Sequence, residues 1–145
     1  MFKIVIDTNV LVSALLKENS LPAFILALIR KGKIKLCYSK EIFEEYEDVL
    51  LREKFHQIKK EVAPLLTSLR KGSLLVKPKG KITEANDPDD NKFLECAVEA
   101  KADFLITGNK KHFPFKSFHH TRIVSPREFI DTALKFIILN TTKKQ

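Results

Sequence analysis

Short apolar runs alternate along this chain with longer segments in which apolar residues recur every three or four positions. The short runs are rich in β-branched residues and predict buried strands at residues 3–7, 34–38, 74–76, 103–107 and 122–124. The longer segments predict helices at about residues 8–16, 22–31, 40–52, 55–69, 87–101 and from 126 onward. Strands separated by helices favour an α/β fold with a parallel sheet covered on both faces.

Capping residues mark several helix ends. Ser39 is placed to cap the helix that follows the second strand. Ser125, Pro126 and Glu128 have the spacing of a capping box with proline in the first turn, so a helix is expected to begin there. Pro64 predicts a kink or a break in the fourth helical segment.

A single domain accounts for this pattern. We find no internal repeat and no linker, so we expect one domain over residues 1–139 and a polar tail at residues 140–145. The 145 residues are 44% hydrophobic and 30% charged, which is enough apolar content for a core. The formal net charge of +8 favours a polyanionic partner such as nucleic acid, although an ordinary basic domain would carry the same charge.

The two cysteines, Cys37 and Cys96, have no Cys or His neighbour at zinc spacing. They are interpreted as small buried hydrophobes in a reducing compartment. The chain shows no signal peptide and no apolar stretch long enough to span a bilayer. We therefore expect a cytoplasmic protein without a membrane partner.

Asp7 directly follows the first predicted strand. The first strand of an open sheet usually lies near its centre, and ligands bind outside the carboxyl ends of such strands. Asp7 is thus a candidate site residue. It also has a structural alternative, because Asp7 itself, Thr8 or Asn9 can cap the helix that follows.

A second acidic cluster opens the helix at residues 87–101. Asp87 comes before a proline and is best interpreted as its N-cap. Steps of ~100° per residue place Asp90 on the same helix face as Phe93, Leu94 and Ala97. A carboxylate that points inward requires a partner, which is either a metal ion or a backbone or arginine contact.

The helix at residues 40–52 carries a third candidate carboxylate. Glu45 lies at one edge of the apolar face and Glu47 at the opposite edge, so periodicity leaves both open. The apolar face itself consists of Ile42, Phe43, Tyr46, Val49 and Leu50.

Asn109 ends the strand at residues 103–107, after Gly108. Its amide oxygen can ligate a hard cation or bind a water molecule, but Gly-Asn is also ordinary turn sequence. The loop that follows is basic and aromatic and can grip a nucleic-acid strand, or it is a solvated loop with phenylalanines packed in the core. Its RNA-binding candidates are Lys110, Lys111 and Lys116.

The chemistry of these side chains suits Mg²⁺ or Mn²⁺ rather than zinc, because the candidate ligands are oxygens. Such ions generate a nucleophilic water and stabilise the phosphate during phosphodiester hydrolysis. No histidine is expected to act as a catalytic base, and His112 is assigned only to the basic loop. The chain contains no Gly-rich phosphate loop and no GxSxG or HExxH motif.

Four segments occur in order along nearly the whole chain: IVIDTNVL at 4–11, SKEIFEEY at 39–46, DPDDNKFL at 87–94 and ADFLITGN at 102–109. Together they resemble the PIN domain family, of the kind found as the toxin of VapBC-type toxin–antitoxin pairs. The resemblance implies a three-layer α/β/α sandwich around a central parallel sheet. It also implies a Mg²⁺- or Mn²⁺-dependent ribonuclease with an antitoxin partner and a homodimeric state.

The resemblance also assigns site residues. It matches Asp7, Glu45 and Asp90 to the family's acidic positions and so favours Glu45 over Glu47. Asn9 matches a polar position beside the first Asp. Asn109 stands where many relatives have a fourth Asp, which leaves open whether one or two metal ions bind.

We therefore predict a metal-dependent endoribonuclease that acts on single-stranded or structured RNA. Asp7 and Asp90 are expected to hold the metal, Glu45 and Asn109 to complete the catalytic site, and Asn9 and Asp87 to support it. Asn109 also motivates an alternative, a PIN-like domain that binds RNA or protein without cutting. A phosphatase of the haloacid-dehalogenase type is disfavoured, because that class needs a second Asp at position 9.

Overall fold

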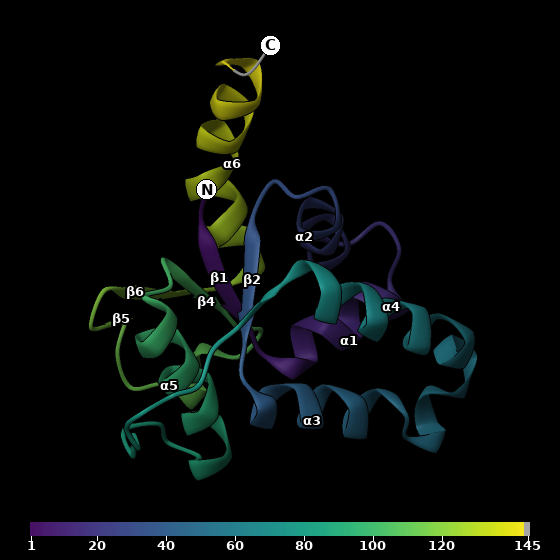
Figure 1. Ribbon diagram of the computed structural model, residues 1–145, viewed down its shortest axis with the longest axis horizontal. Coiled ribbons are helices and arrows are strands. Elements are labelled where there is room, and N and C mark those ends of the chain that lie inside the picture. Colours follow the sequence, from purple (N-terminus) through teal and green to yellow (C-terminus); the bar gives the residue numbers. More distant parts are fainter. Residues whose placement is uncertain (144–145) are drawn as a thin grey trace.

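The computed structural model describes residues 1–143, in which six strands form one sheet flanked by helices (Figure 1). The strands are β1 (Lys3–Ile6), β2 (Lys35–Tyr38), β3 (Leu74–Leu75), β4 (Phe104–Ile106), β5 (Ser117–Phe118) and β6 (Thr121–Val124). Their order in the sheet is β3-β2-β1-β4-β6-β5. Every neighbouring pair is parallel except β5–β6, which forms an antiparallel edge.

The strand order places a topological switch point at the centre of the sheet. From β1 the chain adds β2 and β3 on one side, and it then crosses to add β4 and β6 on the other. β1 and β4 are direct neighbours, and Ile6 of β1 pairs with Ile106 of β4. The carboxyl ends of these two strands are therefore the place where open parallel sheets bind ligands.

Helices cover the sheet in two layers. The α-helices are α1 (Thr8–Leu16), α2 (Leu21–Arg30), α3 (Lys40–Leu50), α4 (Lys59–Gly72), α5 (Asn91–Ala100) and α6 (Pro126–Lys143). α5 contacts β1, β2 and β4, whereas α6 contacts β4, β6 and α2. Figure 1 shows the sheet between α5 on one side and α1, α2 and α4 on the other. The expected α/β/α sandwich around a mostly parallel sheet is confirmed.

The structure corrects the expected elements in three places. Pro64 lies inside α4, and the break in that segment falls earlier, at Ile58, whose φ of −107° and ψ of 9° leave the helical region. The helix expected at 87–101 begins as a 3-10 helix, Pro88–Asp90, before α5. The short edge strand β5 was not predicted, because Ser117 and Phe118 do not belong to an apolar run.

The carboxyl-terminal segment also differs from expectation. α6 continues to Lys143, through most of the segment that was expected to be a polar tail. Residues 144 and 145 lie outside the described part of the chain. Among the described residues, no single helix is long and apolar enough to cross a membrane; α1 and α2 reach that length and composition only together, across a 99° bend.

The predicted capping box at the start of α6 is formed. The backbone N–H of Ser125 donates to Oε1 of Glu128 at 2.9 Å, and the backbone N–H of Glu128 donates to Oγ of Ser125 at 3.1 Å. Lys110 from the loop after β4 adds an ion pair to Glu128 at 2.8 Å. The box therefore joins the beginning of α6 to the loop that borders the switch point.

Replacing Ser125 by alanine should lower the free energy of unfolding by about 1 kcal/mol, because the N–H of Glu128 loses its acceptor. Urea denaturation of both proteins would measure the difference. Ser68→Ala on the exposed surface of α4 is the control, and it should change stability by only a few tenths of a kcal/mol. Equal effects from the two substitutions would contradict a stabilising role for the cap.

Candidate active site

Asp7 occupies the switch point, immediately after β1. Its backbone N–H donates to the carbonyl of Ile106 at 3.0 Å, which fixes it against β4. Oδ1 accepts the N–H of Val10 at 3.1 Å, so Asp7 is also the N-cap of α1. Oδ2 accepts a hydrogen bond from the hydroxyl of Thr107. Burial raises the pKa of this carboxyl, and the hydrogen bond from Thr107 only partly opposes that effect.

Asp90 ends the 3-10 helix that leads into α5, and its side chain is only 16% exposed. Its Oδ2 lies 3.1 Å from Nδ1 of His112, but the two atoms lack the alignment of a hydrogen bond, and this buried oxygen has no hydrogen-bond partner. Burial raises the pKa of Asp90 to about 6; His112 opposes the shift, whereas the charges of Asp87, Asp7 and Glu45 add to it. Asp90 therefore lies within electrostatic reach of the other carboxylates.

Glu45 reaches the same region from α3. Oε2 accepts the hydroxyl of Thr8, the residue after Asp7. Oε1 lies 2.5 Å from the ammonium group of Lys92 on α5, and both side chains are largely buried. Glu47 lies elsewhere, with Oε1 4.0 Å from Arg70. The structure thus brings Glu45 and not Glu47 to the acidic group, which periodicity alone had left open.

Asn109 serves as a turn residue at the edge of this group. Its N–H donates to Oγ of Thr107 at 3.1 Å, and its Oδ1 caps a 3-10 turn by accepting the N–H of Lys111 at 3.1 Å. Its Nδ2 lies 3.0 Å from Nε2 of His112. Asn109 is exposed and connects to Asp90 through His112 rather than directly.

Several polar residues of the site were missed by the sequence analysis. His112 was assigned to the basic loop alone, whereas it bridges Asn109 and Asp90. Thr107 and Lys92 hold the carboxylates of Asp7 and Glu45. One signal could have found His112. It lies three residues after Asn109, and residues three apart in a 3-10 turn lie above one another. The signal was not used because this segment was expected to be an irregular loop.

The supporting candidates lie further out. Asp87 is exposed and accepts the N–H of Asp89 at 3.0 Å, which confirms its capping role. Asn9 is exposed on the first turn of α1. Lys110 is paired with Glu128, whereas Lys111 and Lys116 are exposed.

The loop after Asn109 packs phenylalanines in and against the core, which is one of its two expected forms. Phe113 is buried in the core, as the structural alternative required. Phe115 and Phe118 are half-buried and stack on each other with ring centroids 4.9 Å apart.

The three carboxylates meet without forming a finished metal site. In the part of the chain that the structure describes, no group of three His, Cys, Asp or Glu side chains is arranged as a set of metal ligands. Asp7 is held instead by Thr107, and Glu45 by Lys92 and Thr8. Asp90 alone keeps a buried oxygen without a hydrogen bond.

The sequence of this chain matches a known protein family. A family model described as "PIN domain" matches residues 3–111, which include Asp7, Glu45 and Asp90. The chain belongs to the PIN domain family. This assignment confirms the resemblance drawn from the sequence and sets aside the phosphatase alternative.

Individual proteins also resemble this chain in sequence or in fold. This PIN domain is similar to the uncharacterized protein MJ1680 of Methanocaldococcus jannaschii, with 34% identity over 146 residues that cover 93% of this chain and 94% of the relative. Its fold is similar to VapBC2 from Rickettsia felis, solved bound to a DNA fragment from their promoter, with a TM-score of 0.54, 17% identity and coverage of 84% of this chain and 97% of that one. It is also similar to FitAcB from Neisseria gonorrhoeae, with a TM-score of 0.52, 19% identity and coverage of 86% and 98%.

Proposed function

We propose that this PIN domain is a metal-dependent endoribonuclease that cleaves single-stranded or structured RNA. One observation carries the proposal: Asp7, Glu45 and Asp90 converge from three separate segments at the switch point of the sheet. Carboxylates repel one another, and burial raises the pKa values of Asp7 and Asp90 further. Such a cluster costs stability, and a cation would offset that cost.

The donor set fits a hard divalent cation such as Mg²⁺ or Mn²⁺. Oxygen ligands suit these ions, and the buried Oδ2 of Asp90 makes no hydrogen bond, so an ion there would replace only its contact with Nδ1 of His112 at 3.1 Å. Asp7 and Asp90 would hold the ion. When bound, it would lower the pKa of a water molecule and neutralise charge on the phosphate.

The other residues position these groups. Thr107 orients the carboxylate of Asp7, and its hydroxyl is itself fixed by the N–H of Asn109. Glu45 would accept a hydrogen bond from the attacking water, while Lys92 beside it would attract the phosphate. Asn109 brings no charge and would act by holding the turn that carries His112.

We also propose partners. An antitoxin protein is expected, because the neighbours in fold include VapBC2 and FitAcB, and the family resemblance suggests a homodimer. The cytoplasm is the proposed location, where Cys37 and Cys96, which are free and buried, would remain reduced.

The test is cleavage of a labelled RNA by the purified protein in EDTA, Mg²⁺ or Mn²⁺. A single strand, a hairpin and a DNA strand of the same sequence should be compared, and cleavage of RNA is expected only with metal. RNA binding without turnover in either metal would favour the alternative, a PIN domain that binds and does not cut.

Glu45 and Glu47 provide a matched pair for the third carboxylate. We expect Glu45→Gln to reduce metal-dependent cleavage by about 10²-fold, because a neutral amide accepts a proton or orients a water poorly. Glu47→Gln should leave the rate within about twofold, since Glu47 pairs only weakly with Arg70 outside the acidic group. Single-turnover rates at saturating protein would measure both, and comparable losses in the two variants would argue against the assignment of Glu45.

A further inference from the structure

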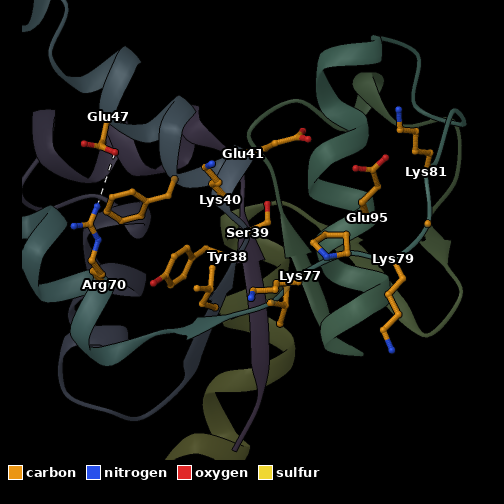
Figure 2. Close-up of a pocket in the computed structure, with 15 residues that line it drawn as sticks. Tyr38, Ser39, Lys40, Glu41, Glu47, Arg70, Lys77, Lys79, Lys81 and Glu95 are labelled. Atoms are coloured by element: carbon orange, nitrogen blue, oxygen red, sulfur yellow. Dashed lines mark ion pairs between the residues drawn. The ribbon is translucent and has the colours of Figure 1, made fainter.

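A cavity of about 730 Å³ lies beside the start of α3, walled by the extended segment that follows β3 (Figure 2). Its apolar lining includes Tyr38 at the end of β2, Phe43 on α3, and Leu75 and Val76. Leu75 is 51% exposed, although it is a large hydrophobic residue. The cavity is therefore a concave apolar surface at the carboxyl edge of the sheet, open to a ligand.

The lining of this cavity is electropositive. Five basic and three acidic residues line it, and the basic residues are Lys40, Arg70, Lys77, Lys79 and Lys81.

Two of the three acidic residues are already engaged. Glu95 accepts the N–H of Ile82 at 3.0 Å, and Glu47 lies 4.0 Å from Arg70. Among the described residues, the ammonium groups of Lys77, Lys79 and Lys81 form no ion pair. These three lysines are available to a polyanion.

The cavity borders the acidic group along α3 and α5. Glu41 lines the cavity and lies one helical turn before Glu45 on α3, so the two share a helix face. Glu95 lines it from α5, three residues after Lys92. Since α3 and α5 contact each other, a strand that leaves the acidic group along these helices would pass over this cavity.

We propose that this cavity binds the single-stranded RNA next to the cleavage site, with phosphates on Lys77, Lys79 and Lys81 and a base against the apolar lining. The inference rests on the proposed nuclease function. Lys77, Lys79 and Lys81 follow one another along a segment that bends at Gly80, so they offer a repeating polyanion several separate positive charges, and apolar surface accepts the face of any base. An acidic peptide could also pair with the three lysines, but the position of the cavity beside the proposed cleavage site favours the RNA strand.

The experiment measures fluorescence anisotropy of labelled oligouridine in EDTA, so that binding is read without cleavage. The triple variant Lys77→Ala, Lys79→Ala, Lys81→Ala is compared with Lys17→Ala, Lys31→Ala, Lys60→Ala, which removes the same charge from exposed sites outside the cavity. Strands of about 12 and about 4 nucleotides are used, because only the longer strand spans both sites.

We expect the cavity variant to weaken binding of the longer strand by about tenfold and to lower the slope of log K against log salt by roughly 2, with a much smaller effect on the shorter strand. The control variant should reproduce neither change. Equal effects of the two variants would overturn the proposal, as would competition by polyglutamate as effective as that by oligouridine of equal charge. A protein that fails to cleave RNA yet shows the cavity effect would refute only the nuclease function.

Discussion

Asp7→Asn is expected to lower metal-dependent RNA cleavage by about a thousandfold or more without unfolding the protein. Asp7 directly follows β1, and its backbone N–H donates a hydrogen bond to the carbonyl of Ile106 on the neighbouring strand β4. An amide is a neutral and weaker ligand than a carboxylate, so the substitution would remove half of the charge that the two proposed metal ligands supply.

The fold should tolerate this change. Asparagine is as good an N-cap as aspartate, so the bond from the N–H of Val10 should be kept through its side-chain oxygen. Its Nδ2 would then face the hydroxyl of Thr107, which can accept as well as donate. The substitution also removes a buried carboxyl group whose pKa is raised by burial.

Two measurements separate these effects. Cleavage rates of wild type and variant with Mg²⁺ or Mn²⁺ test the catalytic role, and thermal unfolding in EDTA tests the fold. Asp89→Asn, at an exposed position in the second acidic segment, is the control for loss of one negative charge. A folded Asp7→Asn protein with more than about a tenth of wild-type activity would remove Asp7 from the proposed chemistry.

The architecture could be predicted from the sequence because its signals are local and repeated. Ser39 and Ser125 marked two helix starts, and both side chains form the expected cap bonds. The antiparallel strand β5 and the 3-10 turn that carries His112 lie outside any apolar run, so both were missed, whereas the equally short β3 lies in the apolar run at residues 74–76. Pro64 does not break the helix: α4 continues through it, with Pro64 on the exposed face, although a proline beyond the first turn has no N–H to donate to the carbonyl four residues before it.

The site was predictable only in part. Strand ends and helix starts located Asp7 and Asp90 because the carboxyl ends of parallel strands meet at one edge. Periodicity left Glu45 and Glu47 open, and the family resemblance favoured Glu45. The structure adds the contact of Glu45 with Lys92, a residue 47 positions away in the sequence. Which polar residue contacts which carboxylate depends on long-range packing, and a periodic pattern does not encode that information.

Asp90→Asn is expected to abolish cleavage. At the same time it should raise the free energy of unfolding of the metal-free protein by about 1–2 kcal/mol near neutral pH, because solvent screens the charge of Asp90 only in part. The pKa of Asp90 rises from 3.8 to about 6 in the folded protein, chiefly by burial. The folded state therefore binds a proton more tightly than the unfolded state does. Consequently the free energy of unfolding of the wild type should fall as the pH rises from about 4 to about 6, and remain low above that range.

In the Asp90→Asn variant the side-chain amide does not bind or release a proton in this pH range. The stability advantage of Asp90→Asn should therefore be present near pH 7 and shrink toward zero as the pH is lowered to about 4, where the wild-type carboxyl is also protonated. Urea denaturation in EDTA at several pH values would measure it, with Asp89→Asn as the exposed control. Added Mg²⁺ should stabilise the wild type and not Asp90→Asn, because the variant lacks a proposed ligand.

These opposite effects on activity and stability distinguish a functional carboxylate from a structural one. A structural Asp90 would make stabilising bonds, so its removal would lower stability at neutral pH. The buried Oδ2 without a hydrogen bond, and the neighbouring charges of Asp7 and Glu45, point the other way. If Asp90→Asn is less stable than the wild type at every pH, the contact with His112 is a stabilising ion pair, and the strongest structural argument for a cation at this position is lost.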